Sequence, residues 1–133
     1  MKKFENYCSN LAALSRADQQ DLENEFVISG IIDKFKMQFE LGWKVLKELL
    51  RYEGRSEANS GSPREILKTA FQVYDFIDED IWIAMLSERN SMSHEYDGNA
   101  AQRLVQTIIA SYIPAFCHVR DCIVKRYPEL TLK

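Results

Sequence analysis

The chain has 133 residues, of which 46% are hydrophobic and 28% are charged. This length and composition suit one globular domain, residues 1–133, with a modest core. Lysine and arginine total 17 against 20 acidic residues, so the net charge is -3. Strong nonspecific binding to nucleic acid is not expected, because such binding depends on neutralising many phosphates and the chain has no long basic run. A small, focused phosphate site remains compatible with this composition.

The cysteine pattern excludes two classes of small protein. Cys8, Cys117 and Cys122 are odd in number and have neither CxxC nor zinc-ligand spacing, so we expect no disulfide framework and no structural metal. No run of about 18 consecutive apolar residues occurs, and polar residues interrupt the amino terminus. There is also no glycine-rich phosphate loop. We therefore expect a cytoplasmic protein that has no bound cofactor and does not contact a membrane.

The first half of the chain carries apolar residues at helical spacing. This pattern predicts a first amphipathic helix from Lys2 to about Ala17 and a second, longer helix from about Glu25 to Glu53. Residues 18–24 form a polar connection. Gly54 follows the second helix at the position where a helix end favours glycine. At roughly 1.5 Å per residue, the second helix is about 40 Å long, a length typical of helical bundles.

The residue pattern in the second half of the chain predicts three more helices. After a polar loop over residues 55–61, a short third helix begins where an N-cap serine, a first-turn proline and a capping-box glutamate follow one another: Ser62, Pro63 and Glu65. Asp78 is expected to cap the fourth helix, whose inward face is formed by Trp82, Met85 and Leu86. The last helix runs from Ala100 to about Arg126, and Pro114 should kink it.

The pattern as a whole predicts an all-α protein. No alternating strand pattern or hairpin signal occurs anywhere in the sequence. The predicted architecture is an antiparallel up-and-down helical bundle of four main helices plus one short helix.

The strongest candidates for phosphate chemistry lie together in residues 89–96, Arg-Asn-Ser-Met-Ser-His-Glu-Tyr. Arg89 offers a permanently charged planar fork for a phosphate, and His94 can move a proton near neutral pH. Tyr96 presents a hydroxyl that can accept a nucleotidyl group. Asn90 could orient either partner through its amide, or it could cap the end of the helix.

Each candidate also has a purely structural interpretation. Arg89 continues an apolar helix face, so it either forms an ion pair, for which Glu40 is the candidate, or it binds a phosphate. His94 lies about 140° from Arg89 on a straight helix. The two side chains can therefore meet at one ligand only if the helix ends near Ser91 or if a second subunit contributes one of them. Tyr96 alone is compatible with simple packing.

Other polar residues offer weaker signals. Glu40, Trp43 and Lys44 are candidate supporting residues of the site; Trp43 is expected in the core, although an exposed edge of this group could contact a partner. His118 has no evident partner. A metal site is not expected at the carboxylates that precede and begin the fourth helix, because helix capping explains them: Asp75, Asp78, Glu79 and Asp80.

Several segments in this order resemble the nucleotidyltransferase substrate-binding protein family, a branch of the HEPN superfamily of helical bundles related to HepT-type toxins. The segments that carry the resemblance are Phe35 to Lys44, Ser62 to Glu65, Trp82 with Met85 and Leu86, Arg89 to Tyr96, and Tyr112 to Pro114. The spacing of Arg89, His94 and Tyr96 fits the superfamily pattern completely.

The resemblance implies a homodimer that acts with a separately encoded minimal nucleotidyltransferase and supplies it with a substrate- or nucleotide-binding surface. Arg89, Asn90, His94 and Tyr96 would bind the nucleotide. In HepT-type relatives the motif cuts RNA without metal, and the partner blocks it by transferring AMP to the motif tyrosine. That alternative would make Arg89 and His94 catalytic and Tyr96 the modified residue. Glu88 and two further acidic residues flank the motif, a setting that favours a nucleotide or a protein partner over RNA.

Overall fold

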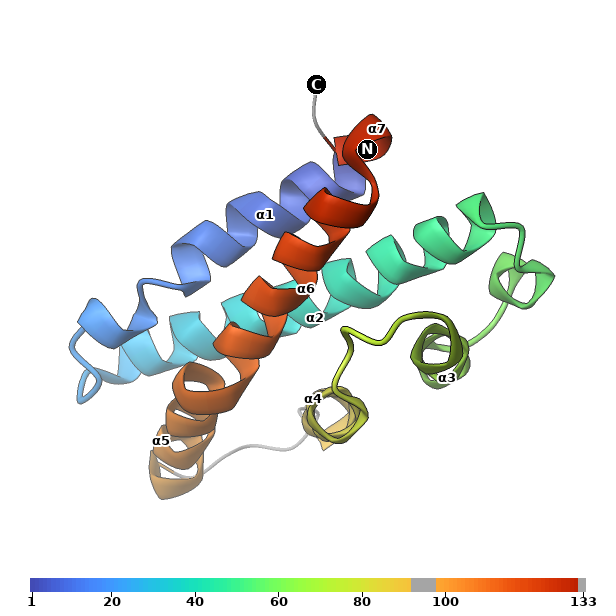
Figure 1. The fold of residues 1–133 in the computed structure, drawn as a ribbon. Coiled ribbons are helices and arrows are strands. Elements are labelled where there is room, and N and C mark those ends of the chain that lie inside the picture. Colours follow the sequence, from blue (N-terminus) through green and yellow to red (C-terminus); the bar gives the residue numbers. More distant parts are fainter. Residues whose placement is uncertain (92–97, 132–133) are drawn as a thin grey trace.

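The computed structural model describes residues 1–91 and 98–131, and in these segments the protein is an all-α helical bundle without strands. Helix α1 (Lys2–Leu14) is followed by the long α2 (Glu25–Tyr52), to which it packs. Helix α2 also contacts α3 (Pro63–Val73), α4 (Glu79–Ser91) and α5 (Gly98–Thr107). Figure 1 shows α3 and α4 end-on, so they run across the direction of α2. The long helix α2 therefore packs against four other helices: α1, α3, α4 and α5.

Local sequence signals explain where the helices begin and end. The Asn24 side chain accepts hydrogen bonds from two amides in the first turn of α2. At its other end, Gly54 has a φ of 81° and the Arg55 amide donates to the Leu50 carbonyl at 2.9 Å, the pattern of a glycine-terminated helix. The capping box predicted at Ser62 and Glu65 is present. These caps confirm the predicted starts of the second and third helices and the glycine that ends the second.

The start of the fourth helix is also confirmed, because the Asp78 carboxylate accepts from the Ile81 amide at 3.2 Å. The first helix ends earlier than predicted, at Leu14, and a short 3₁₀ turn (Ala17–Gln19) follows it. A second 3₁₀ turn (Ser56–Asn59) lies within the predicted polar loop. Short turns of this kind satisfy backbone groups in connections that sequence periodicity does not resolve.

The last long helix contains a π-helical turn (Ile108–Tyr112) between α5 and α6 (Ile113–Arg126). Pro114 lies directly after this turn. Proline has no amide hydrogen and its ring crowds the carbonyl four residues earlier, so a wider turn accommodates it. The structure thus has a π turn just before the proline at which a kink was predicted. A further short helix, α7 (Pro128–Thr131), was not predicted; the Met1 amino group donates to the Leu130 carbonyl at 3.1 Å within it.

The segment Gly98–Arg126 is long and apolar enough to span a membrane by length and composition alone. Its apolar side chains, however, pack in the protein core, among them Leu104, Ile108, Phe116 and Ile123. A core helix of a bundle has the same composition. Since 28% of the apolar window of this segment is buried, core packing accounts for part of its apolar character.

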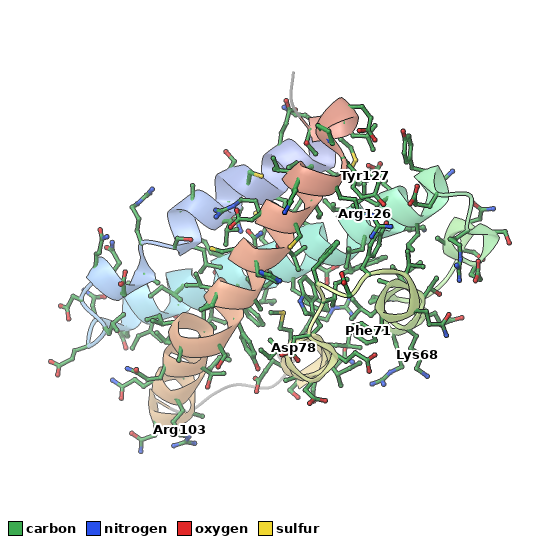
Figure 2. All side chains as sticks on the ribbon, in the orientation of Figure 1. Lys68, Phe71, Asp78, Arg103, Arg126 and Tyr127 are labelled. Carbon is green, nitrogen blue, oxygen red and sulfur yellow. The ribbon has the colours of Figure 1, made fainter. Side chains whose placement is uncertain are left out.

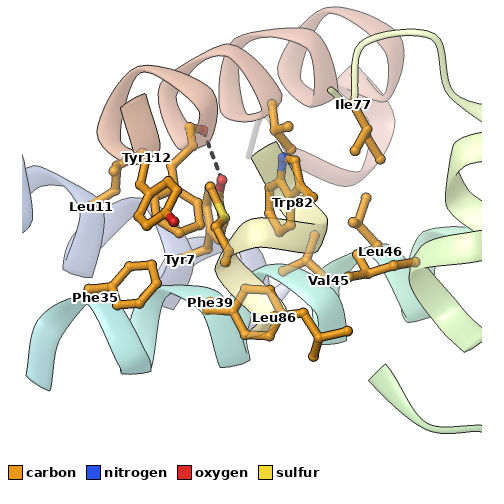
Figure 3. Packing of buried hydrophobic residues seen from close by; sticks show 14 of the residues in the cluster. Tyr7, Leu11, Phe35, Phe39, Val45, Leu46, Ile77, Trp82, Leu86 and Tyr112 are labelled. Atoms are coloured by element: carbon orange, nitrogen blue, oxygen red, sulfur yellow. Dashed lines mark hydrogen bonds between the residues drawn. The ribbon is translucent and has the colours of Figure 1, made fainter. Parts of the chain in front are cut away.

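Aromatic side chains fill the centre of the bundle (Figure 3). The Trp82 ring on α4 contacts Phe39 on α2 and stands edge-on to Phe116 on α6, with ring centroids 6.0 and 5.4 Å apart. The Tyr7 hydroxyl donates to the Phe116 carbonyl at 2.8 Å, and burial raises the pKa of Tyr7 well above its usual value. These contacts join α1, α2, α4 and α6 in one core.

A second aromatic group joins the carboxyl end of α6 to the rest of the bundle. The Tyr74 and Tyr127 hydroxyls are 2.8 Å apart, and burial raises the pKa of both phenols. Arg126 lies over both rings, 5.0 Å from the centroid of Tyr74 and 5.8 Å from that of Tyr127 (Figure 2). Its guanidinium also pairs with Glu53 at 3.7 Å. This group ties α6 to the end of α2.

Gly42 lets α4 approach α2 closely. A methyl group built at Gly42 would lie 2.9 Å from the buried Trp82 ring, whereas one at the exposed Gly30 would meet no atom within 4 Å. We predict that Gly42→Ala lowers the free energy of unfolding by about 1–3 kcal/mol through overpacking. Gly30→Ala, on the same helix, should raise it by about 0.5–1 kcal/mol through helix propensity. Urea unfolding measures both, and equal effects of the two substitutions would contradict the close contact.

Candidate functional site

The described part of the candidate site lies between the last described turn of α4 and the middle of α2. Residues on α2 face Arg89 from the neighbouring helix, and the Phe39–Trp82 contact sets the two helices side by side just beneath them. Gly42 permits this approach. The position of the Arg89 side chain is therefore fixed by core packing as well as by its own hydrogen bonds.

The Glu40 carboxylate holds two donors, one on each oxygen. Its Oε1 accepts from Arg89 Nε at 2.7 Å, and its Oε2 accepts from Trp43 Nε1 at 2.8 Å. The side chains of Arg89 and Glu40 are 34% and 32% exposed, so the pair is only partly removed from water. A short, charge-assisted hydrogen bond to Nε fixes the plane of the guanidinium. The ion pair that the sequence offered as an alternative for Arg89 is thus confirmed.

The outer end of the Arg89 guanidinium has open donor capacity. Its Nη1 donates to the Asn90 side-chain oxygen at 3.2 Å. Within residues 1–91 and 98–131, Nη2 makes no hydrogen bond. Guanidinium groups bind phosphates through such terminal nitrogens, usually two at a time. Pairing with Glu40 therefore does not exclude a phosphate, because Nε is the nitrogen that it occupies.

Sequence reasoning missed the hydrogen bond between Trp43 and Glu40, although it offered both as supporting residues of the site. The half-buried Trp43 ring packs against the core, donates to Glu40 through Nε1 and lies beneath the Lys44 ammonium, 5.8 Å from the ring centroid. The signal was available in the spacing, because residues three apart on a helix are neighbours. Glu40, Trp43, Lys44 and Arg89 thus form one connected group, which we call the Glu40 network.

His94 and Tyr96 lie outside the described residues, so the structure does not place them relative to Arg89. The hypothesis that the helix ends near Ser91 stays a prediction, because the residues that follow lie outside the described segments. His118 has no evident partner in the sequence; in the structure its Nε2 lies 3.7 Å from the Sγ of Cys122. Burial, Asp121 and Asp75 raise the pKa of Cys122, which keeps it as a neutral thiol rather than a nucleophile.

Two further sequence expectations concern metals and disulfides. Cys8, Cys117 and Cys122 are free thiols. Across the described segments, no group of three or more histidine, cysteine or carboxylate side chains is arranged to hold a metal ion. Asp78, part of the acidic stretch before α4, acts as a helix cap, as expected.

A double-mutant cycle tests the Glu40–Arg89 pair. Because the pair is one-third exposed, we expect Glu40→Ala and Arg89→Ala to be coupled by about 0.5–1 kcal/mol in the free energy of unfolding. The free energies from urea unfolding of the two single variants and the double variant give this coupling. Additive effects would show that the 2.7 Å contact contributes nothing measurable.

Comparison with known proteins places these observations in a family. The chain is 28% identical over 92 residues to a protein described as probable ribonuclease HepT from Haemophilus influenzae. That alignment covers 68% of this chain and 63% of the relative, so the chain spans less than two thirds of the relative's length. A family model described as nucleotidyltransferase substrate binding protein like matches residues 2–125. Since this match covers nearly all of the chain, the protein belongs to the nucleotidyltransferase substrate-binding protein family.

Proposed function

We propose that the protein is the substrate- or nucleotide-binding subunit of a two-component minimal nucleotidyltransferase, whose catalytic subunit is encoded by an adjacent gene. The observation that carries this proposal is the Arg89 guanidinium, which Glu40 holds through Nε while Nη2 makes no hydrogen bond to another described residue. A preorganised guanidinium binds a phosphate with little loss of side-chain entropy. The description of the family to which the chain belongs, nucleotidyltransferase substrate binding, supports a nucleotidyltransferase as the partner.

The charge of the site favours a binding role over RNA cleavage. The Arg89 charge is balanced by Glu40, and Glu88 lies one residue before Arg89. A site with so little net positive charge does not concentrate a polyanion, but it can hold one phosphate group by directed hydrogen bonds. In this proposal Asn90, His94 and Tyr96 complete the nucleotide site, two protein copies form a homodimer, and the complex acts in the cytoplasm.

Nucleotide binding provides the first test. We expect the purified protein to bind ATP in isothermal titration calorimetry and to form a complex with the adjacent-gene nucleotidyltransferase. Arg89→Ala should weaken ATP binding by about tenfold or more, because it removes charge-assisted hydrogen bonds. Arg89→Lys should recover only part of this loss, since lysine lacks the planar fork.

Arg64→Ala is the matched control, because Arg64 is exposed on α3 and forms no ion pair among the described residues. It should bind ATP like the wild type. Failure of the wild type both to bind ATP and to associate with the nucleotidyltransferase would reject the proposed function.

A second candidate function is a metal-independent endoribonuclease toxin, which the similarity to probable ribonuclease HepT favours. Arg89 would stabilise the charge that develops on the scissile phosphate. His94 would act as general acid or base while the 2'-hydroxyl of RNA attacks that phosphate and displaces the 5'-oxygen of the next nucleotide. Tyr96 would accept AMP from the partner, which would block the activity.

RNA cleavage separates the two candidates. The ribonuclease hypothesis predicts cleavage that resists EDTA and leaves 2',3'-cyclic phosphate ends, which mass spectrometry of the fragments identifies. His94→Ala should abolish this cleavage by removing the proton-transfer group. His118→Ala changes the other histidine, which is exposed on α6, and should cleave normally. Cleavage by His94→Ala at the wild-type rate would rule out the ribonuclease mechanism.

A further inference from the structure

Helices α1 and α2 leave a groove along their shared surface. Two adjoining hollows lie between them, with volumes of about 580 and 260 Å³. Ala13 of α1 and Lys34 of α2 line both hollows, so they form one continuous depression, which we call the α1–α2 groove. Glu40 lines one end of it. The groove therefore begins at the Glu40 network and runs towards the start of α2.

The floor of the groove is mainly apolar. Ala13, Met37 and Leu41 line the larger hollow, and Val27 and Ile31 line the smaller one. Met37 is 56% exposed, unusual for a large apolar side chain on a polar helix surface. Methionine is common at binding surfaces because its flexible thioether adapts to the shape of a partner. The floor thus offers an apolar surface on which the apolar side chains of a protein partner can pack.

The charged residues of the groove are predominantly positive. Arg16, Lys34 and Lys44 line it, and none of them forms an ion pair with another described residue. The one carboxylate in its lining, Glu40, is already held by Arg89 and Trp43. This concentration of unpaired positive charge occurs in a chain with a net charge of -3. The groove is therefore complementary to an acidic ligand.

An acidic protein segment fits these features better than RNA or a second copy of the chain. None of the lining residues is aromatic, whereas proteins that bind single strands stack bases on aromatic rings. A second copy could offer the acidic residues at the start of α4, Asp78, Glu79 and Asp80. That contact would join two different surfaces head to tail, which leads to open filaments unless the ring closes.

We propose that the α1–α2 groove docks an acidic amphipathic segment of the catalytic nucleotidyltransferase. This inference rests on the proposed function and identifies the surface through which the two subunits meet. Apolar side chains of the segment lie on Met37 and Leu41, while its carboxylates pair with Lys34 and Lys44. Because Glu40 belongs to both the groove and the Glu40 network, the docked partner lies next to the nucleotide that Arg89 holds.

Charge reversal in the groove tests this docking. The double variant Lys34→Glu/Lys44→Glu replaces two attractions by two repulsions and should weaken binding of the adjacent-gene nucleotidyltransferase by about tenfold or more at low salt. Met37→Ser removes apolar floor area and should weaken it by about threefold or more. Biolayer interferometry with the intact partner measures both effects, and circular dichroism checks that the variants are folded.

The control variant is Lys36→Glu/Lys68→Glu. It makes the same change in net charge at two exposed lysines that do not line the groove, and Figure 2 shows Lys68 on the outer side of α3. It should bind the partner like the wild type. The single variants Lys34→Glu and Met37→Ser change residues outside the Glu40 network and should bind ATP like the wild type, so a loss of partner binding in them identifies the groove.

Three results would overturn the proposal. Wild-type partner affinity in Lys34→Glu/Lys44→Glu would exclude the groove as the docking surface and leave the proposed function intact. Absence of partner binding by the wild type would reject the groove together with the two-component function. If Lys34→Glu/Lys44→Glu lost the wild type's binding to a fluorescein-labelled uridine octanucleotide but still bound the partner, the groove would hold nucleic acid instead.

Discussion

The candidate site depends on one carboxylate that is shared between two helices. Glu40 on α2 accepts from Trp43 on its own helix and from Arg89 on α4, so its two oxygens fix the guanidinium relative to the long helix. The contact of Trp82 with Phe39, and the absence of a side chain at Gly42, set the distance between these helices. The position of the Arg89 guanidinium therefore depends both on the packing of α4 against α2 and on the hydrogen bonds of Glu40. A change in either would displace the charged group from its place.

This arrangement also shapes the kind of ligand that the site can hold. An arginine neutralised by a neighbouring carboxylate attracts anions only weakly at a distance, but its fixed donors still discriminate at contact. That behaviour suits a subunit that holds a nucleotide for another protein's chemistry. The α1–α2 groove has the opposite character, with an apolar floor and cations that form no ion pair within the described segments. The two adjoining surfaces would therefore select different partners, a nucleotide at one and an acidic protein segment at the other.

The sequence predicted most of the fold because helix periodicity and capping are local. The capping box at Ser62, the cap at Asp78 and the stop at Gly54 were all confirmed. The π turn before Pro114 and helix α7 were not predicted, because they depend on how the last helix packs and how the two ends of the chain meet. The sequence leaves the Glu40–Arg89 pair as one of two alternatives, because it does not specify how α2 and α4 pack against each other. The groove depends on the packing of α1 against α2, which a single-sequence pattern does not specify, and the positions of His94 and Tyr96 remain predictions.

The candidate site requires that Glu40 holds Arg89 through Nε and leaves the terminal nitrogens to bind a phosphate. Proton–nitrogen NMR correlation spectra of the arginine Nε–H groups test it directly. We expect a slowly exchanging Arg89 Nε–H signal in the free protein, which persists when ATP is added and is lost in Glu40→Ala. An Arg89 signal that exchanges equally fast in the wild type and in Glu40→Ala would show that the carboxylate does not hold the guanidinium in solution.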